Sequence, residues 1–187
     1  MNELIKLRTK IDQIDKNLCK LINERQSLAD KIIKAKGTKF PFDPKRENKL
    51  LKKILEYNID PLLAERIWRQ IISFNLSKQL KMKIGILGDE KYIIAAYEAY
   101  FGSYFESLIF CDKNKFFFSL EKKKIDIGFI EKKAPDLKTY PNNVVKVADF
   151  PLKGKFYNKK FSILISKIDW TPNASFAKKI NSKTKKL

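Results

Sequence analysis

The 187-residue chain contains no histidine and only two cysteines, Cys19 and Cys111. Without an imidazole, it cannot form a Ser-His-Asp or Cys-His nucleophilic site. Two distant cysteines with no histidine complete neither a zinc site nor a disulfide framework. We therefore expect free thiols, no metal and no cofactor, and a reaction that proceeds without imidazole.

Long apolar runs are also lacking. The N-terminal stretch MNELIKLRTKIDQ carries charges throughout, and no segment of the chain approaches the length of a signal-peptide core or a membrane span. Hydrophobic residues make up 44% of the chain, which is enough for a packed core. These features predict a globular, cytoplasmic protein without membrane association, built as one medium domain or two small ones.

Acidic residues are scarce relative to basic ones, and the net charge is +19. An excess of cations is typical of nucleic-acid binding, because lysine and arginine neutralise phosphates. The charge is spread evenly, however: residues 1–81 carry +9 (19 basic, 10 acidic) and residues 82–187 carry +10 (21 basic, 11 acidic). A basic helical nucleic-acid-binding module is therefore kept only as an alternative function.

Arginine is rare among these cations, since 35 of the 40 are lysine. A general need for positive charge is met here by lysine, so each arginine calls for a specific reason. Arg8, Arg25 and Arg46 are thus informative positions.

The first eighty residues carry the pattern of three helices. Apolar residues recur in steps of three and four from Leu4 to Ala35, which predicts one long helix that ends before Gly37. An aspartate followed by a proline then opens a helix at Asp43 and another at Asp60. We expect the third helix to run to about residue 80.

From Lys83 the pattern changes to that of a small α/β domain over residues 82–175. Five short apolar segments predict strands: KIGILG, ESLIFC, DIGFI, VVKVADF and FSILISK. Helices are expected at about 90–101 and 113–123. The last residues, 176–187, form a polar basic stretch that we expect to be a flexible tail.

One cation interrupts the apolar stripe of the long helix, because the series predicts a hydrophobic residue where Arg25 stands. A guanidinium on a packed face needs an anionic partner, either a glutamate of a neighbouring helix or a ligand. Lys36 follows 11 residues later, which brings it to within about 20° of the same face and roughly 16 Å along the axis. Two long side chains can therefore converge on a small anion.

Arg8 cannot join this pair within one chain. It lies 28 residues before Lys36, on the order of 40 Å along the same helix, and points about 80 to 100° away. If Arg8 serves an equivalent site, another protomer must supply it, which favours a dimer. On the third helix, Asn75 and Gln79 share one face and offer amide donors, although a solvated helix end would carry the same residues.

Three strings resemble, in order and spacing, the three helices of the all-helical, type II chorismate mutases: LIKLRTKIDQIDKNLCKLINERQSLADKIIKAK, FPFDPKRENKLL and IISFNLSKQ. The resemblance covers residues 3–81 without a gap. Its most specific parts are Leu-Arg-x-x-Ile-Asp-x-Ile-Asp, Glu-Arg at 24 and 25, the lysine at 36, and Asp-x-x-Arg-Glu from 43 to 47. The resemblance implies an all-α chorismate mutase domain at 1–81.

For this family, the resemblance implies an intertwined homodimer whose pocket is completed by the first-helix arginine of the partner, here Arg8. It implies that Arg8 and Arg25 hold the two carboxylates of chorismate. Lys36 and Gln79 would address the ether oxygen.

The resemblance also implies roles for the second and third helices. Glu47 would accept a hydrogen bond from the ring hydroxyl, assisted by the backbone around Asp43. Arg46 would add positive field at the pocket edge. Position 75 is commonly serine in the family and is Asn75 here, which still donates a hydrogen bond but is larger.

The reaction that the resemblance implies, chorismate to prephenate, is a pericyclic rearrangement of a single substrate. It needs a compact conformer and stabilisation of the polarised transition state, but no nucleophile, metal or cofactor. An isomerase of this kind fits a chain without histidine.

Residues 83–131 look distantly like the start of a prephenate dehydratase domain. Where that family has a Gly-Thr-Tyr-Ser type of loop, this chain has GDEKY, and no threonine is followed by arginine as in the Thr-Arg-Phe motif. We interpret the segment as a truncated or degenerate relative that packs on or modulates the mutase, or as an inert stabilising appendage. A bifunctional mutase/dehydratase remains the second alternative function.

Overall fold

The computed structural model describes residues 2–36, 41–88, 91–131, 140–154 and 157–166. The chain divides into two compact units, Met1–Pro41 and Phe42–Leu187, and each is described by itself. The predicted tail at 176–187 and the predicted helix end at Gly37 lie outside the described residues.

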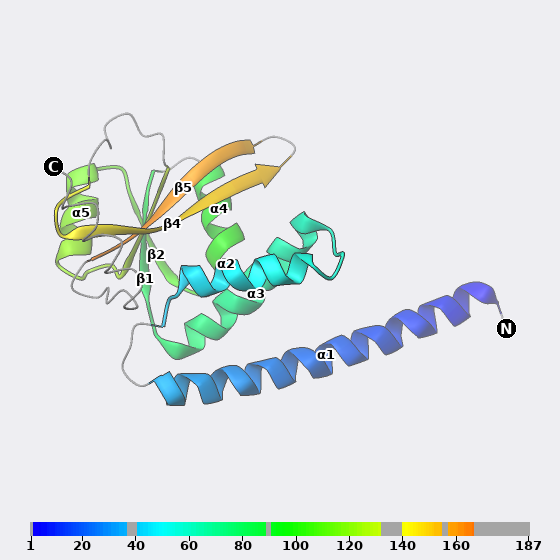
Figure 1. Cartoon of the computed structure of the whole chain (residues 1–187). Coiled ribbons are helices and arrows are strands. Elements are labelled where there is room, and N and C mark those ends of the chain that lie inside the picture. Colours follow the sequence, from blue (N-terminus) through cyan, green and yellow to red (C-terminus); the bar gives the residue numbers. More distant parts are fainter. Residues whose placement is uncertain (1, 37–40, 89–90, 132–139, 155–156, 167–187) are drawn as a thin grey trace, which may run out of the picture. The chain divides into compact units, whose positions relative to one another are not determined.

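The first unit consists, in its described part, of helix α1 (Glu3–Lys36), drawn in blue in Figure 1. With no glycine or proline to interrupt it, the predicted long helix is confirmed as one continuous element. Leu7, Ile11, Ile14 and Leu18 are about half exposed, because a lone helix has nothing to pack against within its own unit. The apolar stripe is thus available to a partner surface.

The second unit begins with α2 (Pro44–Leu55) and α3 (Pro61–Gln79), both at the predicted positions. The side chains of Asp43 and Asp60 cap these helices, since each accepts a hydrogen bond from a backbone N–H three residues on, at 3.1 and 2.8 Å. In each helix the first residue is the proline that follows the capping aspartate. The short local pattern Asp-Pro therefore defines both starts.

All five predicted strands and both predicted helices of the α/β segment are present (Figure 1). In chain order they are β1 (Lys83–Leu87), α4 (Lys91–Phe101), β2 (Glu106–Phe110), α5 (Lys113–Glu121), β3 (Ile127–Glu131), β4 (Val144–Gly154) and β5 (Tyr157–Ser166). They form one mixed sheet in the order β2-β1-β3-β5-β4, in which β1 pairs in parallel with β2 and β3, and β5 runs antiparallel to both of its neighbours.

The last two strands are longer than predicted. The predicted strand VVKVADF ends at Phe150, yet β4 continues to Gly154, and Pro151 pairs with Lys160 of β5. A proline is tolerated there because β4 is the edge strand, so one side of it needs no hydrogen-bond donors. This extension was not predicted because the local sequence does not show that β4 lies at the edge of the sheet.

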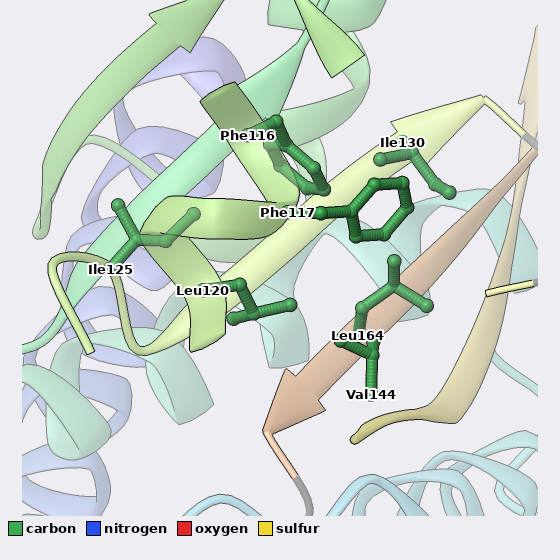
Figure 2. Packing of buried hydrophobic residues seen from close by; sticks show 7 residues of the cluster. All are labelled: Phe116, Phe117, Leu120, Ile125, Ile130, Val144 and Leu164. Atoms are coloured by element: carbon green, nitrogen blue, oxygen red, sulfur yellow. The ribbon is translucent and has the colours of Figure 1, made fainter. Parts of the chain in front are cut away.

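Helices α4 and α5 cover opposite faces of the sheet. A Cβ placed on Gly128 of β3 would lie 2.6 Å from the ring of Phe116 on α5. The next residue, Phe129, has its ring 6.3 Å from that of Tyr97 on α4. Successive residues of a strand point to opposite faces, so the two helices lie on different sides. Figure 2 shows the α5 face, where the buried cluster is Phe116, Phe117, Leu120, Ile125, Ile130, Val144 and Leu164.

Helix α3 packs on α4, so α2 and α3 share a compact unit with the sheet. The side chains of Gln70 and Ser73 donate hydrogen bonds to the backbone carbonyls of Glu98 and Tyr100, at 3.2 and 2.9 Å. Gly102 ends α4 with a φ of +63°, and a Cβ there would lie 2.7 Å from the Gln70 side-chain oxygen. Glycine at this position therefore suits both the positive φ and the close approach of the Tyr104 ring, which would lie 2.6 Å from a Cβ.

No helix in the described ranges is both long enough and apolar enough to cross a membrane. The two cysteines are free thiols, as expected, and both are exposed.

Candidate active site

The eight predicted site residues fall into two groups. Three lie on α1 and five lie on or beside α2 and α3: Arg8, Arg25 and Lys36 in the first group, and Asp43, Arg46, Glu47, Asn75 and Gln79 in the second. Each group belongs to one compact unit, so its geometry is considered separately.

The α1 group follows from the continuity of the helix. Since α1 is unbroken from Glu3 to Lys36, Arg25 and Lys36 lie on one face at the predicted spacing. By the same geometry, Arg8 stays on the order of 40 Å from Lys36 along the axis. The side chain of Lys36 is not among those described.

Glu47 is the best-defined group of the second set. It is buried on α2, with an exposed fraction of 9%. Its Oε2 accepts a hydrogen bond from Nη1 of Arg69 at 2.8 Å and another from the hydroxyl of Tyr100 at 3.0 Å. A buried carboxylate is thus held by a cation of α3 and a phenol of α4.

Burial governs the ionisation of this carboxylate. Removal from water raises the pKa of Glu47 to about 7, and the nearby charge of Asp43 adds to the rise. The charge of Arg69 and the hydrogen bond from Tyr100 act in the opposite direction. The pKa of Tyr100 is itself raised well above its usual value, mainly by burial. Glu47 is therefore placed to change charge near neutral pH.

Arg69 was not among the predicted site residues, although it is almost fully buried. Its Nη2 donates to Oδ1 of Asn48 at 3.2 Å, and its guanidinium stacks over the ring of Tyr100 at 4.1 Å. Its Nε has no hydrogen-bond partner among the described residues. The rarity of arginine in this lysine-rich chain is the sequence signal that could have identified it.

Asn75 and Gln79 lie one turn apart near the end of α3. Asn75 is buried, and its Nδ2 has no hydrogen-bond partner in the part of the chain that the structure describes. A buried donor without an acceptor costs about 1 to 3 kcal/mol, so a ligand that supplies the acceptor is favoured. Gln79 is half-buried and is the last residue of the helix.

Asp43 and Arg46 differ from the other members of the set. The carboxylate of Asp43 is engaged in capping α2, where it accepts the backbone N–H of Arg46. The side chain of Arg46 is exposed on the first turn of α2, so it can act on a ligand only through its charge or by reaching across solvent.

Residues 7–80 match the model of the type II chorismate mutase family. The chain is 40% identical over 97 residues to a bifunctional chorismate mutase/prephenate dehydratase of Aquifex aeolicus and 36% identical over 90 residues to one of Neisseria gonorrhoeae. These alignments cover 47% and 46% of this chain and 27% and 25% of the relatives. The chain thus spans about a quarter of the length of these bifunctional relatives.

A shorter relative is covered almost completely. The chain is 34% identical over 85 residues to a chorismate mutase of Methanocaldococcus jannaschii, an alignment that covers 42% of this chain and 86% of that protein. No solved structure matches the chain.

Proposed function

Because the chain belongs to the type II chorismate mutase family, we propose that it is an isomerase that rearranges chorismate to prephenate in the biosynthesis of phenylalanine and tyrosine. The observation that carries the proposal is the buried Nδ2 of Asn75, for which the described residues offer no acceptor. Gln79 adds a second amide one turn further along the same helix. A dicarboxylate substrate supplies such acceptors.

The proposed roles divide between anchoring and catalysis. Arg25 and the Arg8 of a second protomer bind the two carboxylates of chorismate, and the amide of Asn75 assists by donating to one of them. Glu47 accepts a hydrogen bond from the ring hydroxyl, near the backbone of Asp43, while Arg46 contributes positive field at the pocket edge. Together these contacts hold the compact conformer from which the rearrangement proceeds.

Lys36 and Gln79 act on the bond that breaks. As the ether carbon–oxygen bond lengthens and the new carbon–carbon bond forms, the ether oxygen gains negative charge. An ammonium and an amide donor directed at this oxygen stabilise the transition state more than the ground state. No proton is transferred and no covalent intermediate forms, so the absence of histidine is no obstacle.

The proposal includes a homodimer. The apolar stripe of α1 is uncovered within its own unit, and Leu63 and Ile67 of α3 are also exposed. A second copy that covers such stripes would bury apolar surface. It would also bring its Arg8 to the pocket of the first copy, which the Arg8 of the first copy cannot reach.

Mixing two inactive variants tests the shared pocket. Arg8→Ala and Arg25→Ala are each expected to be nearly inactive alone. In a heterodimer, the Arg8→Ala chain supplies an intact Arg25 while its partner supplies Arg8, which restores one of two pockets. Co-expressed or co-refolded variants should recover about a quarter of the wild-type activity for random pairing. If Arg8 acts within its own chain, the mixture stays inactive.

The pH profile of the mutase reaction tests the role of Glu47. Protonation removes the negative charge of its carboxylate and turns one acceptor oxygen into a donor, which weakens its hydrogen bond to the ring hydroxyl. The pKa of Glu47 is about 7. Below that pH the ionised fraction of Glu47 falls. We therefore expect kcat/KM to decrease, by a factor that approaches ten for each further pH unit. Glu47→Gln, which does not titrate, should lower the rate and flatten the acid limb. An identical limb in the variant would assign it to another group.

The alternative is a bifunctional enzyme, favoured by the names of the relatives from Aquifex aeolicus and Neisseria gonorrhoeae. We interpret residues 82–175 as a reduced relative of the dehydratase domain. A cavity of about 380 Å³ lies beside α5, lined among others by Lys113, Glu121 and Tyr140. It contains none of the predicted site residues.

Product analysis separates the candidate functions. Prephenate as the sole product of purified protein and chorismate supports the mutase. Phenylpyruvate formed without acid treatment supports the bifunctional enzyme. No turnover, together with salt-sensitive DNA binding, supports the basic binding module.

A further inference from the structure

Tyr100 connects the α/β segment of the second unit to Glu47, which we propose binds the ring hydroxyl of the substrate. It lies on α4, has an exposed fraction of 2%, and donates its hydroxyl to Oε2 of Glu47 on α2 at 3.0 Å. The two residues are 53 positions apart in the sequence. The contact therefore reaches from the α/β segment, to which no role has been assigned, into the helices that match the mutase family.

The geometry at Glu47 fixes the orientation of its carboxylate. Tyr100 and Arg69 both bind Oε2, at 3.0 and 2.8 Å. Rotation of the carboxylate would break both hydrogen bonds in a buried site, where neither donor could turn to water instead. Oε1 is engaged by neither of these two donors, and its direction is set by them.

Tyr100 is itself held firmly. Its backbone carbonyl accepts a hydrogen bond from Ser73 at 2.9 Å. Its ring packs edge-on against Phe150 of β4, with the centroids 5.0 Å apart, and against Phe42, 6.4 Å apart. The guanidinium of Arg69 covers one face of the ring. Both the backbone and the ring are thus fixed, so the hydroxyl has little freedom to leave Glu47.

We infer that Tyr100 and Arg69 are positioning residues for the mutase reaction, which hold Oε2 of Glu47 so that Oε1 is presented to the ring hydroxyl of the substrate. The inference rests on the proposed function. It makes the α/β segment part of the mutase site, because α4 supplies the phenol and β4 supplies the ring of Phe150 against which it packs. Arg69 and Tyr100 act through Glu47 and do not touch the substrate.

The test is the pH dependence of kcat/KM for chorismate in Tyr100→Phe. The groups that face the carboxylate are Arg69 from α3, Tyr100 from α4 and Asp43 at the start of α2. Loss of the phenol removes a hydrogen bond that favours the ionised form, so the acid limb should move up by about one pH unit. At pH 7, kcat/KM should fall severalfold.

Tyr97→Phe is the matched control. Tyr97 lies on the same helix and is buried, but its hydroxyl donates to the backbone carbonyl of Phe105 at 3.3 Å. Its loss should leave the acid limb where it is in the wild type. Arg69→Lys is a second variant, which keeps the cation but loses the fork that binds Glu47 and Asn48 together, and it should move the limb in the same direction as Tyr100→Phe.

The outcomes separate this inference from the proposed function. A wild-type protein that leaves chorismate unchanged overturns both. A wild-type enzyme whose acid limb is unmoved in Tyr100→Phe and Arg69→Lys overturns the positioning role alone. An equal shift in Tyr97→Phe also overturns it, because the effect would then belong to the packing of α4 in general.

Discussion

Replacing Lys36 with alanine is expected to lower the turnover of chorismate about 10²- to 10³-fold, which corresponds to about 3 to 4 kcal/mol of barrier. The reason is that Lys36 is proposed to supply the only full positive charge directed at the ether oxygen, where negative charge develops in the transition state. Because the substrate carboxylates are assigned to Arg8 and Arg25, kcat should fall much more than KM rises.

Lys34→Ala provides the control for this variant. The Lys34→Ala substitution removes the same charge from the same last turns of α1. Lys34 is exposed, however, and lies about 200° around the helix from Lys36. Its rate should stay near that of the wild type, and circular dichroism should show the same helix content for both variants. Equal rates in the two lysine variants would contradict the assignment of Lys36.

Arg69→Met is expected to lower the free energy of unfolding by about 3 to 5 kcal/mol. Arg69 and Glu47 form a buried ion pair, with exposed side-chain fractions of 4% and 11%. Removing the cation leaves the carboxylate of Glu47 buried without charge compensation, and it also leaves the ring of Tyr100 without the guanidinium stacked on it. Urea denaturation of the two proteins at pH 8, where Glu47 is mostly ionised, measures the difference.

Two further variants show that the loss belongs to the ion pair. Arg66→Met removes an exposed arginine one turn earlier on α3 and should change stability by no more than about 0.5 kcal/mol. The double variant Glu47→Met with Arg69→Met removes both charges, so it should recover much of the loss. A double variant as unstable as the sum of the two single variants would show that the residues do not interact.

The elements of the fold could be predicted because their signals are local. The Asp-Pro pairs at Asp43 and Asp60 define the starts of α2 and α3, and the uninterrupted apolar spacing defines α1. The five strands follow from short apolar runs. The extent of β4 was missed because its edge position, which permits Pro151, depends on the order of strands in the sheet.

The candidate site could be predicted only in part. The eight residues named from the sequence rest on helix spacing and on the family resemblance, and both describe contacts within residues 3–81. The hydrogen bond between Glu47 and Tyr100 spans 53 positions and depends on how α3 packs on α4, which no periodic pattern encodes. Arg69 was missed because it lies opposite the apolar series Leu63, Ile67, Ile71 and Phe74 of α3, on the side that carries the buried Ser73 and Leu76.

The most direct test of the proposed mutase activity is the rate of chorismate loss in the presence of the purified full chain, with identically purified Arg25→Ala as the blank. We expect loss of chorismate far above the uncatalysed rate, with prephenate as the product, and a rate near background for a folded Arg25→Ala protein. A wild-type rate equal to that of Arg25→Ala, or to buffer alone, would contradict it.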